Sequence, residues 1–262
     1  MVTKIEVEKN LEKAVKSAVD ELGGFGMFVT EGDVVLLKPN FNTADPYPAS
    51  TSMDFLSAVT KLCYEQKVKT VIIAESCTMT QNTRRVMETL GVFELEKDLE
   101  PCPRILVLEE RDWVKKEIPN AKYLKHVTIP KLLEKVDKHI LLPCLKTHFQ
   151  AEYTGALKLG VAYMKPWERI HLHMSNIEEK IAELNSLYNV DLVIMDARQC
   201  FIADGPTKGP TAEPGLILAS DSRVEIDIEG IKTIQGFKGN SLKNFEAEDL
   251  PQIARAREIG IK

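Results

Sequence analysis

The chain has 262 residues, of which 44% are hydrophobic and 28% charged, an ordinary balance for a globular protein. Its formal net charge of -5 argues against a general attraction to nucleic acid or anionic lipid, because that attraction grows with clustered lysine and arginine. The N-terminal segment lacks the unbroken apolar core of a signal peptide, and no stretch reaches the roughly 18 apolar residues of a membrane span. We therefore expect a cytoplasmic protein that binds neither nucleic acid nor membranes.

The first two predicted elements show a pattern that the rest of the chain repeats. Apolar residues three and four positions apart predict a helix over 11–22, which Gly23 and Gly24 end. The run 34–37 is apolar without alternation, as expected of a strand buried on both faces of a parallel sheet.

Helices and short apolar strands continue to alternate along the chain. Ser52 can cap the next helix, and the spacing of Ser175 and Glu178 is that of a capping box. The pattern is weak between Pro101 and Val136. The remaining predicted elements are helices over 52–63 and 82–90, a short helix after Pro130, helices over 175–188, 222–231 and 253–257, and strands at 71–74, 105–108, 139–142, 192–195 and 216–219.

This alternation predicts a three-layer α/β fold, with a mostly parallel sheet and helices on both faces, because parallel strands need crossovers long enough to hold a helix. There is no internal repeat, low-complexity run or clear linker. We therefore expect a single domain over residues 1–262, with 100–130 and 150–174 as candidates for a small inserted lobe.

Polar residues follow the predicted strands, where ligands collect in open α/β sheets. They are Lys38 and Asn40, then Glu75 and Ser76, then Lys146, Thr147 and His148, and then Asp196. These groups can bind anions, hold a metal or move protons. Each of these residues, taken alone, is equally well explained by its place in a solvent-exposed loop, because loops at strand ends are usually polar.

The densest polar stretch runs from Lys146 to Gly160. Its two lysines, Lys146 and Lys158, together with His148 and several small residues, suit an anionic ligand, because lysine supplies charge and glycine lets backbone N–H groups approach. The alternative is a solvated loop whose charges serve solubility. No dinucleotide or P-loop signature follows a strand, which argues against standard nucleotide sites.

Two further segments are candidates for the site. On an extended backbone, His171 and His173 would project to one side, and with His148 they would offer three nitrogen ligands to a divalent metal. The alternatives are local hydrogen bonds and acid–base work. The loop 205–210 follows a strand, and Lys208 could anchor a ligand there; a plain rigid connection would have the same sequence.

Several motifs in this order resemble one family, that of domain of unknown function 362. They are KPN at 38–40, IAES at 73–76, LKTH at 145–148, TGALKLG at 154–160 with the following His171, MDA at 195–197, GPTKGP at 205–210 and ASD at 219–221. The resemblance implies an α/β fold and no agreed activity. Many relatives carry a ferredoxin-type iron–sulfur segment, whereas the five cysteines of this chain are widely spaced and include no C-x-x-C pair.

The residues favour a protein that binds a small anionic metabolite, with or without a divalent metal, and they leave open whether it is an enzyme. His148, Lys146 and Glu75 are the candidates for catalysis. Lys38, Asn40, Lys158, Asp196 and Lys208 are the candidates for ligand binding. The competing hypothesis is a non-catalytic electron-transfer or assembly accessory that works with a ferredoxin-like iron–sulfur partner, since a cluster within this chain is not expected.

Overall fold

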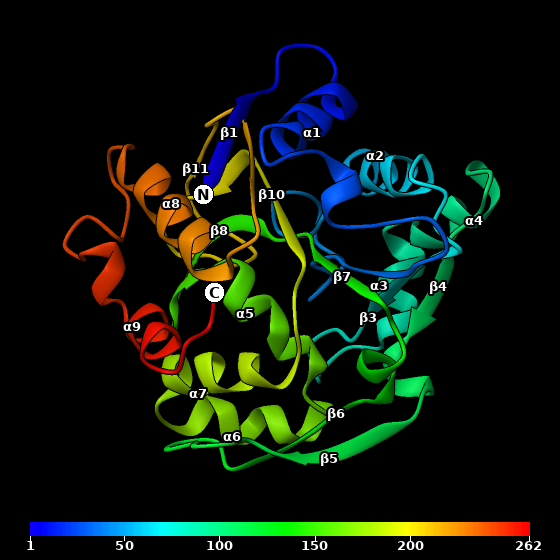
Figure 1. Ribbon diagram of the computed structural model, residues 1–262. Coiled ribbons are helices and arrows are strands. Elements are labelled where there is room, and N and C mark those ends of the chain that lie inside the picture. Colours follow the sequence, from blue (N-terminus) through cyan, green and yellow to red (C-terminus); the bar gives the residue numbers. More distant parts are fainter.

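Ten strands form one mixed sheet in the computed structural model, which describes residues 1–262 (Figure 1). Five central strands are parallel, and two antiparallel strands extend one edge. In order across the sheet, these strands are β1 (Val2–Glu6), β12 (Leu216–Ser220), β10 (Leu192–Phe201), β7 (Lys138–Leu141), β2 (Val34–Lys38), β3 (Thr70–Glu75) and β4 (Arg104–Val107).

A proline divides the strand that was predicted at 139–142 from the polar segment after it. Pro143 lacks the N–H that a continuous ladder would need, and the chain changes its neighbour there. The following strand, β8 (Cys144–His148), pairs with the second half of β10, and β9 (Glu152–Thr154) then pairs antiparallel with β8. This shift carries the residues after Pro143 beyond the central ladder, toward the carboxyl ends of the strands.

In addition to β8 and β9, three short strands lie outside the central path. They are β11 (Thr211–Ala212), which pairs with β10, and β5 (Trp113–Glu117) and β6 (His126–Pro130), which form a separate two-stranded sheet. The predicted lobe segment 100–130 contains this small sheet, which lies at the lower edge of the molecule in Figure 1. The segment 150–174 begins with β9 and continues as short helices.

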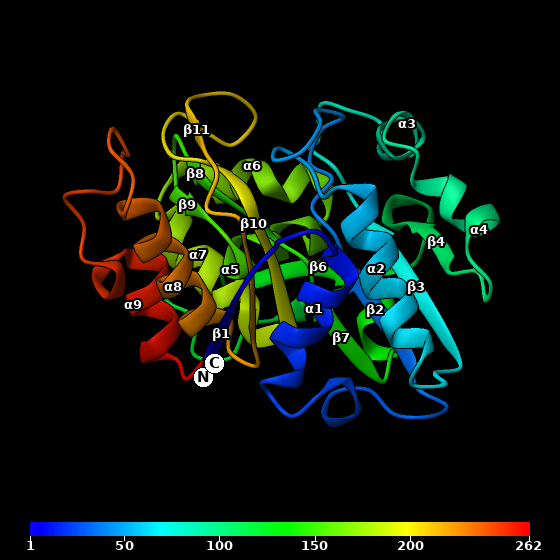
Figure 2. The ribbon, with the colours of Figure 1, turned by 90° about the horizontal axis from the view of Figure 1, so that it is seen from above.

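Nine α-helices cover the two faces of the sheet, which confirms the three-layer α/β prediction. In Figure 1, α1 and α2 lie above the sheet, whereas α5, α7 and α9 lie below it. Figure 2 shows the molecule from above, with α1 and α2 on the viewer's side of the sheet. The helices are α1 (Leu11–Asp20), α2 (Met53–Tyr64), α3 (Thr83–Thr89), α4 (Leu95–Asp98), α5 (Ala156–Leu159), α6 (Arg169–Met174), α7 (Ile177–Leu184), α8 (Arg223–Gln235) and α9 (Pro251–Glu258).

The alternation of side chains along β2 explains why both faces are covered. Val35 and Leu37 pack in one apolar cluster with α1 and α2, while Leu36 between them packs in another with Tyr163 and Tyr188. All three strand residues are fully buried, as expected of a strand between two helical layers. A third cluster joins α5, α7, α8 and α9 to β8, β10 and β12.

Two of the predicted helix caps differ in detail. Ser175 does not cap α7, which begins after Asn176 in a left-handed conformation and has no side-chain cap. Ser52 is the N-cap residue of α2, but its hydroxyl does not bond to that helix and instead accepts a hydrogen bond from Arg198 Nη2 at 2.6 Å. None of the helices combines the length and apolar character needed to cross a bilayer.

Candidate functional site

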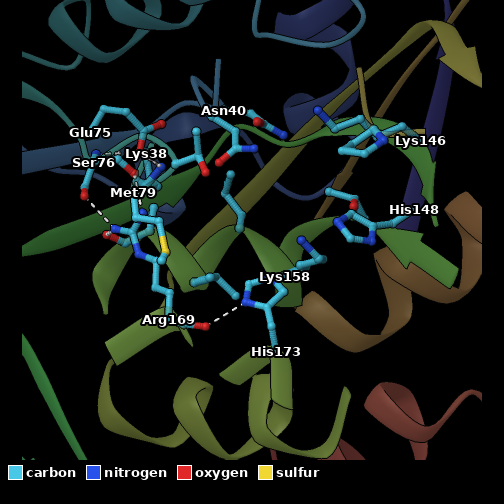
Figure 3. Close-up of a pocket in the computed structure, with 17 residues that line it drawn as sticks. Lys38, Asn40, Glu75, Ser76, Met79, Lys146, His148, Lys158, Arg169 and His173 are labelled. Carbon is cyan, nitrogen blue, oxygen red and sulfur yellow. Dashed lines mark hydrogen bonds and ion pairs between the residues drawn. The ribbon is translucent and has the colours of Figure 1, made fainter. Parts of the chain in front are cut away.

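A cavity of about 130 Å³ lies at the carboxyl ends of β2, β3 and β8. Residues of α5 and α6 form its other wall, and Pro206 from the loop after β10 also lines it. This volume is well below the roughly 300–1,000 Å³ of pockets for drug-sized molecules, so the cavity suits a ligand of few atoms. Of the predicted site residues, the lining includes Lys38, Asn40, Glu75, Lys146, His148, Lys158 and His173 (Figure 3).

Lys38 and Glu75 form a buried ion pair at the ends of neighbouring strands. Lys38 Nζ donates to Glu75 Oε1 at 2.7 Å and to the carbonyl of Pro39 at 2.6 Å. Glu75 also accepts the backbone N–H groups of Phe41 (2.8 Å) and Ser76 (2.7 Å). Burial lowers the pKa of Lys38, although Glu75 acts in the opposite direction. The two charges offset each other, so the pair orders this wall of the cavity without adding net charge.

Lys146 extends into the cavity from β8 and has no carboxylate partner. Alternation along β8 places Lys146 and His148 on one face and Thr147 on the other, where the Thr147 hydroxyl accepts the N–H of Gly205. Lys146 is 1% exposed, and its single hydrogen bond goes to the carbonyl of Ala49 at 2.5 Å. Burial lowers the pKa of this ammonium group, whose remaining N–H groups are available to a ligand.

The hydrogen bonds of His148 determine which nitrogen faces a ligand. Nδ1 accepts the backbone N–H groups of Gln150 and Ala151, both at 3.1 Å, so it carries no proton. Burial, assisted by Lys158 and Lys146, lowers the pKa of His148 to about 2. The ring is therefore neutral near pH 7, with its proton on Nε2. It can donate a hydrogen bond, whereas Nδ1 is already occupied.

Lys158 extends from α5, whose first turn is anchored by a carboxylate on α8. Asp227 accepts the N–H groups of Ala156 (2.6 Å) and Leu157 (2.9 Å), two of the donors that a helix N-terminus leaves free. A side chain at Gly155 would meet Asp227 Oδ1 at 2.1 Å, so only glycine allows this approach. Burial, assisted by the nearby positive charges of Lys146 and Arg169, lowers the pKa of Lys158 to about 7.

Arg169, at the start of α6, was not among the predicted site residues. Its guanidinium makes five hydrogen bonds, to the carbonyls of Ser76, Cys77, Ala162 and Met164 and to the hydroxyl of Ser76. An arginine has five N–H donors, so none is left for a ligand. Arg169 thus braces the exit of β3 against the segment after α5, and contributes positive charge to the cavity without contacting what binds there.

The structure does not assemble the predicted three-histidine metal site. Residues 169–174 form a helix, where positions two apart point to different faces, and not the extended segment on which the hypothesis depended. His173 lines the cavity with His148, whereas His171 is exposed and does not. No group of three histidine, cysteine, aspartate or glutamate side chains in residues 1–262 is placed to hold a metal ion.

Two other predicted ligand-binding residues lie outside the cavity. Asp196 was predicted to follow a strand that ends at 195, but β10 continues to Phe201 and Asp196 lies within it. It is fully buried there and accepts hydrogen bonds from Tyr47 and Arg198; Arg198 Nη2 lies 2.8 Å from Asp196 Oδ2. Arg198 also pairs with Asp54 of α2. This network fastens α2 to the sheet. Lys208 is exposed on its loop and does not line the cavity, although Pro206 of the same loop does.

Two neutral groups complete the polar lining. The Thr154 hydroxyl is buried and has no hydrogen-bond partner, although nearly all buried polar groups in proteins have one. Asn40 is 6% exposed, and its neighbouring backbone is held by Thr51, whose hydroxyl accepts the Asn40 N–H at 2.8 Å. Lys146 and Thr154 are directly opposite each other on β8 and β9. The cavity therefore offers hydrogen-bonding groups beside a cation that lacks a counter-charge.

Comparison with known families identifies the family of this chain. Residues 35–232 match the family model described as Domain of unknown function (DUF362). The chain belongs to this family. The match contains every cavity residue from Lys38 to Pro206, so the site lies within the family's common domain.

Two individual proteins are similar to this chain. The chain is 28% identical over 260 residues to the thylakoid-associated protein sll1697 of Synechocystis sp., covering 96% of this chain and 76% of that protein. Among solved structures, it is similar to the lactate racemase apoprotein from Thermoanaerobacterium thermosaccharolyticum, with a TM-score of 0.47 and 13% identity, covering 90% of this chain. This chain spans 62% of the length of that structure.

Proposed function

We propose that this DUF362 chain binds a small carboxylate- or phosphate-bearing metabolite in the cavity at the carboxyl ends of its parallel strands. The observation that carries the proposal is that Lys146 and Lys158 face one cavity and that neither takes part in an ion pair. Lys146 is 1% exposed, and a buried charge without a partner costs several kcal/mol. An anionic ligand would supply the missing counter-charge and accept the unused N–H groups.

The neutral groups would orient the ligand. The Nε2–H of His148 and the side-chain amide of Asn40 are donors, and the Thr154 hydroxyl both donates and accepts. Because the donors of Arg169 are taken up by backbone carbonyls and by the hydroxyl of Ser76, we assign Arg169 to shaping the cavity and to its electrostatic field. The Lys38–Glu75 pair would hold the opposite wall.

Thermal denaturation with a panel of small anions tests the proposal. Acetate, lactate, pyruvate, malonate and inorganic phosphate are compared with neutral amides of the same size, so that charge is the only difference. At least one anion is expected to raise the melting temperature saturably in the wild type, as mass action requires of a ligand that binds the native state.

Matched variants locate the effect. Lys146→Met keeps much of the side chain but removes the charge, and should abolish the stabilisation. Lys125→Met makes the same change at an exposed lysine between β5 and β6, outside the cavity, and should leave it intact. Equal responses of the two variants, or a wild type that responds to neutral amides as well as to anions, would refute an anion site in this cavity.

A further inference from the structure

Lys158 differs from the other lysines of the cavity because nothing bonds to its amine. Lys38 is held by Glu75 and a carbonyl, and Lys146 by the carbonyl of Ala49. The influences on Lys158 are burial and two positive neighbours, Lys146 and Arg169, and they include no hydrogen bond or carboxylate. All three influences favour the neutral amine. In its neutral form, such an amine in a confined polar cavity is a nucleophile.

We propose that Lys158 Nζ forms an imine with the carbonyl carbon of a small 2-oxo acid, whose carboxylate lies beside Lys146. This inference rests on the proposed function, because the carboxylate is the anion that the cavity would bind. In a 2-oxo acid the carboxylate and the carbonyl are adjacent, so a ligand of few atoms can reach both lysines. The cavity of about 130 Å³ limits the substrate to that size.

The backbone that carries Lys158 is fixed, as a covalent nucleophile requires. Asp227 holds the first turn of α5 from one side, and the side-chain amide of Asn185 donates to the carbonyl of Leu157 at 2.8 Å from another. Figure 3 shows Lys158 near His148 and His173, on the opposite side of the cavity from the Lys38–Glu75 pair. Lys158 and His173 both contribute to lowering the pKa of His148, which agrees with this grouping.

The two histidines present opposite hydrogen-bonding characters to the amine. His148 Nδ1 accepts two backbone N–H groups, so its Nε2 bears the proton. His173 Nδ1 lies 2.7 Å from the carbonyl of Arg169, which can only accept, so Nδ1 bears the proton and the neutral ring has a lone pair on Nε2. His148 is thus a hydrogen-bond donor for the carbonyl oxygen, and His173 is a proton acceptor.

The chemical step balances with these groups alone. The amine lone pair forms the C–N bond as the C=O π bond breaks, and the oxygen, held by the His148 Nε2–H, becomes a hydroxyl. The two protons of the amine pass to that oxygen, with His173 Nε2 accepting and returning them. The C–O bond then breaks, water leaves and a C=N bond remains. No oxidant, reductant or metal is needed for this reversible condensation.

Borohydride trapping tests the inference directly. The protein is incubated with pyruvate, glyoxylate or 2-oxobutyrate and reduced with sodium cyanoborohydride, and its mass is then measured by mass spectrometry. One equivalent of label is expected, with a mass equal to that of the oxo acid minus one oxygen atom, and peptide mapping should place it on Lys158. Lactate and acetate have the carboxylate but no ketone or aldehyde group. They should add no mass, and they should compete with the oxo acid for the cavity and so reduce labelling.

Three variants make the result specific. Lys158→Arg keeps a long basic side chain but cannot form a stable imine, so it should lose the label entirely and remain folded by circular dichroism. Lys146→Met keeps the nucleophile and should raise the half-saturating concentration of oxo acid about ten- to hundredfold. Lys125→Met should be labelled like the wild type.

The possible failures are distinguishable. If lactate and pyruvate stabilise the protein equally and no probe labels Lys158, the anion site stands and the imine is refuted. If no anion stabilises the protein and no label forms, both proposals fail. Label spread over exposed lysines, and unchanged in Lys158→Arg, would also overturn the imine, because it would show ordinary surface reactivity.

Discussion

Replacing Lys38 with methionine is expected to destabilise the fold, whereas the same replacement at Lys146 is not. Lys38 neutralises Glu75, a carboxylate that is 1% exposed, and removing one partner of a buried ion pair costs about 3–5 kcal/mol. Lys146 has no such partner. Its removal leaves the Ala49 carbonyl without a donor, at about 1–3 kcal/mol, but also relieves a buried charge that lacks a counter-ion.

These free energies convert to measurable temperatures. Unfolding entropy near the melting point is about 2.1 cal/mol/K per residue, so for 262 residues each kcal/mol corresponds to about 2 °C. Lys38→Met should therefore melt about 5–9 °C below the wild type. Lys146→Met should stay within about 3 °C of it, because its two effects oppose each other.

Differential scanning calorimetry in a buffer without carboxylate or phosphate measures both shifts. A drop of more than about 5 °C for Lys146→Met would show that Lys146 stabilises the apo-protein, and would refute the assignment of its charge to a ligand. An unchanged melting temperature for Lys38→Met would refute the view of Lys38 and Glu75 as a structural pair. The anion response of both variants, measured in the same instrument, separates stability from binding.

Three further outcomes follow from the site. Because the pKa of Lys158 is lowered to about 7, anion binding at pH 8 should take up protons and weaken as the pH rises, which calorimetry in two buffers measures. Arg169→Met should lower the free energy of unfolding by at least about 3 kcal/mol, since several carbonyls lose donors; Arg169→Lys, with three donors, should not restore it. Asp227→Ala should lower it by about 2 kcal/mol in urea and weaken anion binding, whereas the exposed control Glu225→Ala stays within about 0.5 kcal/mol.

The buried strands were predictable because their local pattern records their environment. Val34 to Leu37 and Val71 to Ala74 are continuous apolar runs, which only a strand covered on both faces requires. The edge strand β1 was missed for the same reason. It pairs only with β12 and is partly exposed, so Val2, Thr3 and Ile5 form no continuous run.

The histidine segment shows how a local pattern can mislead. Ile170, Leu172 and Met174 alternate with His171 and His173, which is typical of a strand. In the structure these residues form a short helix in which Leu172 is buried while Ile170 and Met174 are 52% and 73% exposed. The alternation is therefore not the burial pattern of a sheet.

The site residues also divide into those that the sequence predicts and those that it does not. Lys38, Glu75, Lys146 and His148 follow strands, so topology alone predicts that they meet. Arg169 and Asp227 act through backbone groups distant in the sequence, which no local pattern encodes. Asp227 left one signal, a carboxylate on the same helix face as Val224 and Ile231, where a buried acid needs specific donors.

A buried charge can serve stability or ligand binding, and the charged residues of the cavity differ in which of the two they suit. A charge kept for stability is neutralised or saturated, as Glu75 is by Lys38 and Arg169 is by its five acceptors. Lys146 and Lys158 are neither, and each lowers the pKa of a neighbour instead of forming a pair. Because an unpaired buried ammonium costs free energy, Lys146 is the residue on which the proposed anion site depends, and an anionic ligand would supply the partner that it lacks.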